Sequence, residues 1–389
     1  MGRGNLSTKL LFAPLLALLV FLTACGGGPP SVGWSRPVIG QGALYISSTG
    51  GKVYALDPVS GAKKWQYPAD SNRIVAQTSS LYAAPVVCGD YVIAASSDKM
   101  LYVLKAATGE KHCTFETGDA IIATPAYDAG MVYVGSADVA PDLLRNPDLS
   151  RIPELFRPTP SKLYAVDLSQ RDAKGQCVKK WEFQTQNRVW AEPLIIGDRL
   201  YVASLDHRLY ALDRASGKKI WDFAAEGAIA SSPKHADGII YFGSFDTKVY
   251  AVNADTGKVA WSQPFSTGNW VWADPLIVGD LVIIGSLDRN VYALDAKTGR
   301  QKWVFSTGDG VRAAAAGREG VVFVGSEDRK VYALNVTNGS PVWEYNAVDK
   351  VLASPTLING LVVVQNTNHR VIALDAATGQ EKWKFETDK

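Results

Sequence analysis

The sequence predicts an all-β chain, an eight-bladed β-propeller whose blades are four-stranded, antiparallel and docked to one another by tryptophans. Two observations lead to this fold class. The segment VYALDAKTGRQKW at residues 291–303 recurs along most of the chain. Between its copies, short runs rich in Val, Ile, Tyr, Phe and Trp are separated by Gly, Asp, Asn and Thr, and no amphipathic helical stretch of useful length interrupts them. Four short strands repeated every ~40–50 residues are typical of a propeller.

The recurring segment occurs eight times. The last six of its tryptophans are 40, 40, 42, 40 and 40 residues apart. Its aspartate position is filled by Asp57, Lys105, Asp167, Asp213, Asn253, Asp295, Asn335 and Asp375. Its tryptophan position is filled by Trp65, Cys113, Trp181, Trp221, Trp261, Trp303, Trp343 and Trp383.

Each copy is expected to supply four strands. In the fifth copy we place them at residues 230–235, 239–244, 248–253 and 258–265. A four-stranded blade cannot bury both of its faces alone, so neighbouring blades must stack and the ring must close. An aromatic ring buries ~150–250 Å², so we interpret the tryptophan on each outer strand as a wedge between blades rather than as a functional residue.

The first 24 residues have the features of a signal peptide. Arg3 and Lys9 precede an apolar run at 10–22, which is 13 residues long and too short to span a bilayer. The run ends in Leu-Thr-Ala before Cys25, a bacterial lipobox, so we expect cleavage at this point and a lipid on the Cys25 sulfur. Residues 25–33 then form a flexible, Gly-rich tether, and the propeller occupies 34–389. The alternative is a plain secretory signal that happens to end at a cysteine.

The repeat resembles the PQQ-type propeller repeat, whose Ala-x-Thr-Gly-x-x-x-Trp pattern stands here as AKTGRQKW at residues 296–303. The resemblance covers residues ~34 to 389, essentially all of the mature chain. Two families share this repeat: the quinoprotein dehydrogenases, and the non-enzymatic lipoprotein BamB of the outer-membrane β-barrel assembly machinery. Blade number, length and the lipidated cysteine are similar to BamB. That family implies a scaffold in the cell envelope, on the outer membrane if the cell has one, with a membrane β-barrel as partner.

Charge and cysteine content narrow the function further. The chain has 40 Lys and Arg against 38 Asp and Glu, and the leader holds two of the cations, so the mature part is balanced at 38 of each. A balanced chain lacks the basic footprint that nucleic acid requires. Besides Cys25 there are Cys88, Cys113 and Cys177, which allow one disulfide without indicating the pair. The four histidines are scattered, and no Cys or His spacing suits haem or zinc.

Three functions remain open on the sequence. A quinoprotein dehydrogenase closes its PQQ against a disulfide between adjacent cysteines, and the sequence contains no Cys-Cys pair. We therefore expect no enzyme activity and no cofactor. An envelope scaffold that binds a protein partner is the favoured interpretation, and a propeller that binds a small sugar-like or aromatic ligand is the alternative.

The innermost strands carry a second repeated pattern, Ala/Ser-x-Pro. Three residues before the proline position, four copies have a large aromatic side chain: Trp34, Tyr82, Trp190 and Trp272. Charged side chains stand at the same position or two residues later: Arg36, Glu192, Asp274 and Arg312. By strand alternation the two positions project to one side. We expect these residues either to line one mouth of the central channel as a binding site, or to plug the axis.

The third copy carries a long insertion at residues 139–161, between its second and third strands. It is rich in proline and contains Leu144, Ile152 and Phe156. A long loop in a compact repeat array is functional or disordered, so we consider both a partner-binding arm and an ornamental loop. Strand geometry predicts that the insertion rises on the same face as the aromatic mouth.

Overall fold

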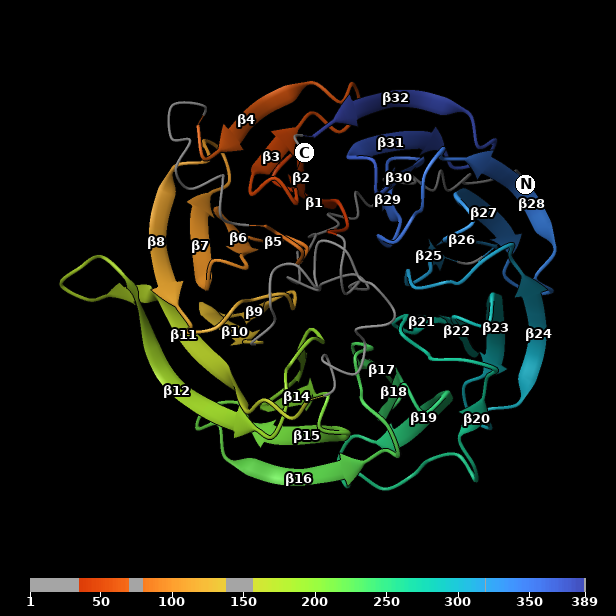
Figure 1. Ribbon diagram of the computed structural model, residues 1–389, viewed down its shortest axis with the longest axis horizontal. Helices are drawn as coiled ribbons and strands as arrows, with labels where there is room; N and C mark the ends of the chain where they lie inside the picture. Colours follow the sequence, from red (N-terminus) through yellow and green to blue (C-terminus); the bar gives the residue numbers. More distant parts are fainter. Residues whose placement is uncertain (1–34, 70–79, 138–156, 319, 388–389) are drawn as a thin grey trace, which may run out of the picture.

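The computed structural model describes residues 35–69, 80–137, 157–318 and 320–387. Over these residues the chain forms eight four-stranded sheets, each made of four consecutive strands, arranged as blades around a central axis (Figure 1). All strand pairs within the blades are antiparallel, as blade 6 illustrates. The eight-bladed propeller predicted from the repeats is confirmed.

The strands of each blade run from the axis to the rim in chain order. Blade 1 comprises β1 (Val38–Gly40), β2 (Ala43–Ser47), β3 (Val53–Leu56) and β4 (Lys63–Tyr67). Blade 2 comprises β5 (Val86–Cys88), β6 (Tyr91–Ala95), β7 (Met100–Lys105) and β8 (Lys111–Glu116). Blade 3 comprises β9 (Ala126–Asp128), β10 (Met131–Gly135), β11 (Ser161–Arg171) and β12 (Cys177–Thr185). Blade 4 comprises β13 (Leu194–Ile196), β14 (Arg199–Ala203), β15 (Arg208–Asp213) and β16 (Lys219–Ala224).

The second half of the ring repeats this order. Blade 5 comprises β17 (Lys234–Ala236), β18 (Ile239–Gly243), β19 (Lys248–Asn253) and β20 (Phe265–Ser266). Blade 6 comprises β21 (Leu276–Val278), β22 (Leu281–Gly285), β23 (Asn290–Asp295) and β24 (Gln301–Ser306). Blade 7 comprises β25 (Ala316–Arg318), β26 (Val321–Gly325), β27 (Lys330–Asn335) and β28 (Pro341–Asn346). Blade 8 comprises β29 (Thr356–Ile358), β30 (Leu361–Gln365), β31 (Arg370–Asp375) and β32 (Glu381–Glu386).

Blade 5 departs from the expected strands at both its inner and outer edges. The inner strand is shorter than predicted, and the outer strand predicted at residues 258–265 is reduced to β20, which pairs with β19 only through Lys248↔Ser266 and Val249↔Phe265. Pro264 has no N–H group to donate to a ladder, which limits pairing at this edge. Trp261 nevertheless stays in place, since it is 3% exposed and its Nε1 donates to the Ala296 carbonyl at 2.8 Å.

The recurring tryptophans dock on the next blade, as the sequence predicted. Each indole lies against the glycine of the neighbouring turn, so closely that a Cβ on that glycine would fall within 3 Å of the ring. Most of these indoles also donate a hydrogen bond from Nε1 to a carbonyl of the next blade. The pairs are Trp65–Gly109, Trp181–Gly217, Trp221–Gly257, Trp261–Gly299, Trp303–Gly339, Trp343–Gly379 and Trp383–Gly61.

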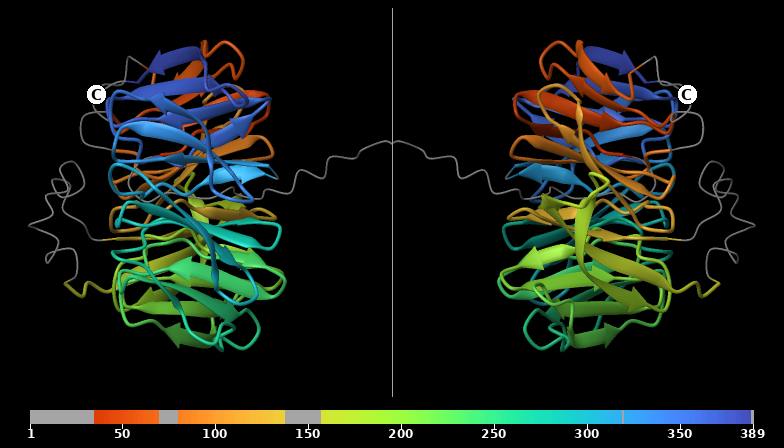
Figure 2. Two further views of the ribbon diagram at one scale, coloured as in Figure 1. Left: turned by 90° about the vertical axis from the view of Figure 1, so that its right-hand side faces the viewer. Right: turned by 90° about the vertical axis from the view of Figure 1, so that its left-hand side faces the viewer.

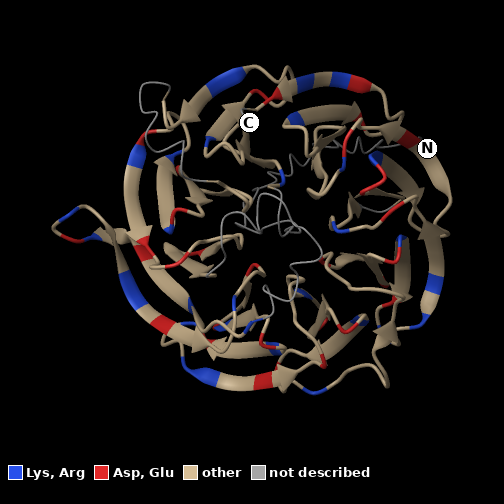
Figure 3. Cartoon of the chain, in the orientation of Figure 1, with Lys and Arg blue, Asp and Glu red and all other residues tan. Residues whose placement is uncertain are grey.

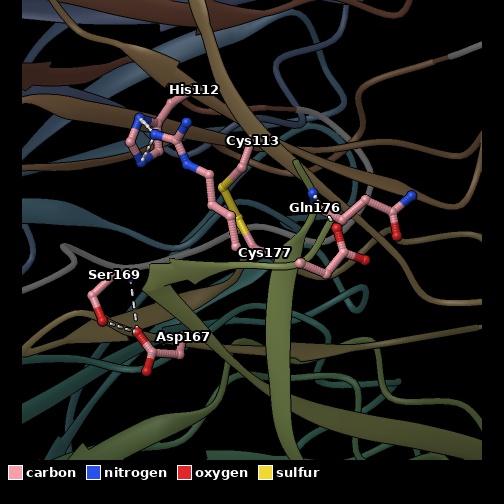
Figure 4. The surroundings of a disulfide bond; sticks show 8 residues. His112, Cys113, Asp167, Ser169, Gln176 and Cys177 are labelled. Carbon is pink, nitrogen blue, oxygen red and sulfur yellow. Dashed lines mark hydrogen bonds between the residues drawn. A yellow bond between two sulfur atoms is a disulfide. The ribbon is translucent and has the colours of Figure 1, made fainter. Parts of the chain in front are cut away.

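A disulfide takes the tryptophan's place between blades 2 and 3. Cys113, on β8, stands at the repeat position of the tryptophan and is bonded to Cys177, the first residue of β12, with the two Cα atoms 5.7 Å apart (Figure 4). The hairpin of β11 and β12 is longer than its counterparts and extends beyond the rim of the ring (Figure 1). Arg171, near its tip, contacts His112 of blade 2. Blades 2 and 3 are thus held by a covalent bond where the other pairs use an indole.

The ring closes by packing of blade 1 on blade 8. Leu44 and Ile46 of β2 share one buried cluster with Val363 and Val371 of blade 8. Near the axis, the Thr356 hydroxyl donates to the Pro37 carbonyl at 2.5 Å. The molecule is a disc (Figure 2). In the described residues, no helix has the length and apolar character needed to cross a bilayer.

Candidate functional site

The two faces of the disc are distinguished by the loops they carry. The loop after β10 lies against the segment that leads into β13, because the Val189 N–H donates to the Ser136 carbonyl. The loop after β14 does the same, since the Leu205 N–H donates to the Arg188 carbonyl at 2.9 Å. We call the face with these second-to-third-strand loops the insert face. The opposite face, which carries the turns between first and second strands, is the turn face.

An aromatic cluster lies around the axis toward the insert face. It consists of Tyr82, Trp190, Phe245, Trp270 and Trp272, together with small aliphatic side chains. The rings of Trp190 and Trp272 are stacked with centroids 5.9 Å apart, and Phe245 lies 4.9 Å from Trp270 and 5.0 Å from Trp272. Two of the four predicted aromatic residues therefore stack on each other, and a third, Tyr82, belongs to the same cluster.

Exposure divides this aromatic cluster into two parts. Tyr82 and Trp190 are 2% and 3% exposed, so they are packed inside and fit the plug interpretation. Trp270 and Trp272 are half-buried and remain accessible at one edge of the cluster. Trp34, the fourth predicted aromatic residue, lies outside the described residues.

An ion-paired group borders the accessible edge. The Arg312 guanidinium lies over the Trp272 ring at 4.9 Å from its centroid, and its Nε contacts Glu327 Oε1 at 2.5 Å. The Lys350 ammonium contacts the other Glu327 oxygen at 2.8 Å. Burial alone would raise the pKa of Glu327, but the two cations outweigh it and hold this pKa below its usual range. We call Trp270, Trp272, Arg312, Glu327 and Lys350 the rim patch.

The other charged candidates do not join Arg312 but lie deeper along the axis. Arg36 interacts electrostatically with Glu192 and Asp274. Lys234 interacts with all three of these groups. The Asp274 Oδ1 accepts a hydrogen bond from the Ser232 N–H at 2.5 Å. We call Arg36, Glu192, Lys234 and Asp274 the axial charge cluster.

Burial shifts all four groups of the axial charge cluster toward their neutral forms. It raises the pKa of Glu192 above its usual range and that of Asp274 to about 7. It lowers the pKa of Lys234 and of Arg36, although the opposite charges nearby counteract both shifts. Removing ions from water is costly even when they are close to counterions. Burial of the axial charge cluster is therefore expected to lower the free energy of unfolding.

A cavity of about 490 Å³ opens next to the axial charge cluster. Glu192 and Lys234 line it together with the inner strands of blades 3 to 6. Its prolines are Pro125, Pro193, Pro233 and Pro275. Residues 194–196 and 276–277, in β13 and β21, line it as well. They follow Trp190 and Trp272 along the chain toward the turn face, so the cavity lies on the turn-face side of the aromatic cluster.

The described ends of the insertion in blade 3 lie on the insert face. The Thr159 N–H donates to Asn187 Oδ1 at 3.3 Å, and Arg188 Nη1 donates to the Arg157 carbonyl at 3.3 Å. The residues leading into β11 leave the disc on the same side as the C-terminus (Figure 2). Leu144, Ile152 and Phe156 lie outside the described residues, as does the proposed lipidation site Cys25.

Sequence reasoning missed several members of these groups. Phe245 and Glu327 occupy one repeat position, directly after the serine that ends the second strand, and this position could have been compared across the copies. Trp270 and Lys350 share another, just before the apolar residue that leads into the inner strand. Lys234 is the clearest signal, because the residue after the inner-strand proline position is uncharged in all other copies.

Charged side chains and possible metal ligands are distributed over the part of the chain that the structure describes. Cations and anions are interspersed around the ring, and neither gathers on one side (Figure 3). Within the described ranges, no group of three or more His, Cys, Asp or Glu side chains is arranged to hold a metal ion.

One protein-family model matches most of the sequence. The family model described as outer membrane protein assembly factor BamB matches residues 27–172, 236–314 and 306–389, which is more than half of the chain. The chain belongs to the BamB family. No curated protein sequence matches it significantly.

Solved structures with the same fold include one member of this family. BamB from Moraxella catarrhalis has a TM-score of 0.65 at 18% identity, over 85% of this chain and 91% of that one. A quinohaemoprotein alcohol dehydrogenase from Pseudomonas putida has a TM-score of 0.66 at 15% identity, over 88% of this chain and 70% of that one. The computationally designed protein Ika8 has a TM-score of 0.68 at 14% identity, over 93% and 98%. At these identities the likeness concerns the fold alone.

Proposed function

We propose that this chain is a non-enzymatic scaffold of the cell envelope, anchored by a lipid on Cys25, which binds a protein partner through its insert face. Membership of the BamB family supports a role in outer-membrane protein assembly, with a membrane β-barrel as the partner. The lipobox supports the anchor, since stable attachment requires more than one acyl chain and lipoprotein processing supplies two or three.

The observation that carries the proposal is the rim patch. Tryptophan and arginine are the residue types that most often dominate binding energy at protein interfaces. Here Trp270 and Trp272 are half-buried, so each presents an edge while the rest of its ring is packed. The Arg312 guanidinium is held in one position by Glu327 and by the Trp272 ring. A rigid aromatic and cationic surface of this kind loses little side-chain entropy on binding.

The proposal is tested by recovering the partner from envelope extracts with the purified mature chain. The variant Trp270→Ala with Lys350→Ala removes two side chains of the rim patch without touching the buried Trp190. Its matched control is Val59→Ala with Lys297→Ala, which changes an exposed apolar side chain and a lysine in turn-face loops. We expect the rim variant to lose at least tenfold in recovery of a membrane β-barrel and the control to lose none. Equal recovery by both variants would exclude the insert face.

Quinoprotein chemistry is the competing function, because an alcohol dehydrogenase shares the fold. The sequence has no adjacent cysteines, and Cys113 and Cys177, which are 64 positions apart, form a bond between two blades. We therefore expect no quinone absorbance after incubation with PQQ and calcium, and no dye-linked oxidation of alcohols or sugars. Calcium-stimulated, PQQ-dependent oxidation would overturn the assignment as a non-enzyme.

A further inference from the structure

The cavity on the turn-face side of the axis is lined mostly by proline and aliphatic side chains, with Glu192 and Lys234 at the axial charge cluster and with Tyr127, Asp128 and His235 elsewhere in the lining. Four inner-strand prolines contribute to its walls, and proline has no backbone N–H to offer a ligand. Leu194, Ile195, Leu276 and Ile277 add aliphatic surface. The volume of about 490 Å³ lies within the ~300–1,000 Å³ that is usual for small-ligand sites. The walls therefore suit a compact molecule with an apolar body.

The charged end of the cavity leaves hydrogen-bonding capacity of both kinds unused. Glu192 lines the cavity, and no described residue donates a hydrogen bond to its carboxyl group, whose Oε2 atom is buried. Asp274, whose Oδ2 atom also lacks a donor among the described residues, lies behind the lining residues. The Lys234 ammonium, which lines the cavity, makes no hydrogen bond or ion pair with a described residue, although it interacts at longer range with both carboxyl groups. A buried polar atom without a partner is destabilising, and more so when it is charged.

A ligand that satisfies this end must carry both a donor and an acceptor. A simple anion could pair with Lys234 but would meet the Glu192 carboxyl group. A simple cation could pair with Glu192 but would meet Lys234. A neutral apolar molecule would contact the walls but would leave Glu192 and Lys234 without hydrogen-bond partners. An ammonium group beside Glu192, with a carboxylate on Lys234, satisfies both requirements.

We propose that the axial cavity binds a short zwitterionic peptide, a dipeptide or tripeptide with apolar side chains. Its ammonium group donates to the carboxyl group of Glu192, its carboxylate accepts from Lys234, and its side chains contact the proline and aliphatic walls. The opposing interpretation is that the axial charge cluster is an internal ion group that only holds the inner strands together. The two interpretations differ in what a peptide's charges contribute to binding.

The decisive experiment uses the wild-type mature protein and two peptides with the same side chains. Leucyl-leucine, which is zwitterionic, is compared with N-acetyl-leucyl-leucinamide, which has neither terminal charge, by isothermal titration calorimetry at low ionic strength. Hydrogen bonds to charged groups are stronger than those between neutral groups, so we expect the capped peptide to bind at least ~10-fold more weakly. Equal affinity of the two peptides, or no binding of leucyl-leucine at millimolar concentration, would overturn the proposal.

Two variants locate the binding in the cavity. Lys234→Met keeps a long side chain and removes its charge, and Glu192→Gln keeps the shape of the carboxyl group. The control is Lys248→Met on the same blade, whose lysine pairs with Glu226. We expect both cavity variants to lose ~10-fold or more in affinity for leucyl-leucine and the control to keep it. Loss in the control, or retention in Lys234→Met and Glu192→Gln, would overturn the proposal.

This inference is independent of the scaffold function. The cavity lies on the turn-face side and the rim patch on the insert face, so recovery of a protein partner and binding of leucyl-leucine are separate measurements. Either result stands if the other fails.

Discussion

The indole of Trp383 in the last blade lies against Gly61 in the first blade. A Cβ at Gly61 would stand 2.7 Å from Trp383 Cε3, and Gly61 also has a φ of +73°. The last tryptophan of the chain thus docks on the first glycine turn with the same ring-to-glycine contact as the other tryptophans, but its Nε1 donates no hydrogen bond to a described residue.

Replacing Gly61 with alanine is expected to destabilise the propeller more than a positive φ alone explains. Gly42 is a matched control, because its φ is +69° and a Cβ there would meet nothing within 4 Å. The control should lose about 1–2 kcal/mol from backbone strain. Gly61→Ala should lose about 1–3 kcal/mol more, because the methyl group displaces Trp383. Urea unfolding measures both, and equal losses would show that the Trp383 contact does not contribute to closure.

The disulfide between blades 2 and 3 is expected to contribute to the free energy of unfolding. Cys113 and Cys177 are 64 positions apart, and the chain-entropy account gives about 4 kcal/mol for a loop of that length. The double variant Cys113→Ser with Cys177→Ser should therefore unfold at lower urea concentration than the wild type. Its circular dichroism in buffer should stay that of a β-protein, since the other blade contacts remain. An unchanged urea midpoint would mean that packing alone holds these blades.

Stability should fall between pH 4 and pH 7 through Asp274. Burial raises the pKa of Asp274 from 3.8 to about 7, so over this range the folded chain keeps a proton that the unfolded chain has lost. The folded state then binds more protons than the unfolded state, so the free energy of unfolding decreases as pH rises. Asp274→Asn should reduce this slope, by an amount on the order of 1–4 kcal/mol across the range, with Arg36, Glu192 and Lys234 left in place.

Asp295 serves as a control, because its pKa is shifted in the opposite direction to that of Asp274. Hydrogen bonds from Lys302 and Thr298 lower the pKa of Asp295 to about 2, so its contribution is present above pH 4 and is lost as pH falls toward 2. Asp295→Asn should leave the slope between pH 4 and pH 7 unchanged. If both variants alter that slope equally, the effect does not originate in the axial charge cluster.

Replacing Cys25 with serine is expected to release the protein from the membrane or to leave an unprocessed precursor. The prediction rests on the lipobox and on the tether that follows it. Fractionation of cells and the mass of the recovered chain are the measurements. A variant that stays with membranes at the normal mature mass would show that lipidation is not the anchor.

The fold could be predicted because the features that build it recur at fixed spacing. Trp303 and Gly339 are in contact across two blades, and the same pair of positions is repeated in the sequence. One such contact therefore predicts the equivalent contacts between the other blades. The exceptions were visible as changes in the pattern. Cys113 replaces a tryptophan, but the sequence alone does not show that Cys177 is its partner, because that requires knowing which hairpin of the next blade reaches it.

The candidate site was predicted less completely, since its residues are defined by what lies across the axis. Strand alternation placed Trp190 and Trp272 on one side, and they do stack. The same reasoning grouped Arg312 with Glu192 and Asp274, whereas Arg312 pairs with Glu327 near the insert face and the two acids lie deeper. Alternation specifies the side of a strand, but it does not specify the depth along the axis or the residues of opposite blades.

Each sheet of the described chain is built from four strands in direct succession, so blade 1 needs no strand from the C-terminal end. Closure depends on side chains, above all Trp383 on Gly61, and not on a shared ladder. Strand pairing therefore does not determine which blade comes first in the chain. A circular permutant that begins at another blade boundary should assemble the same disc, and gain or loss of whole blades by duplication would proceed without breaking a sheet.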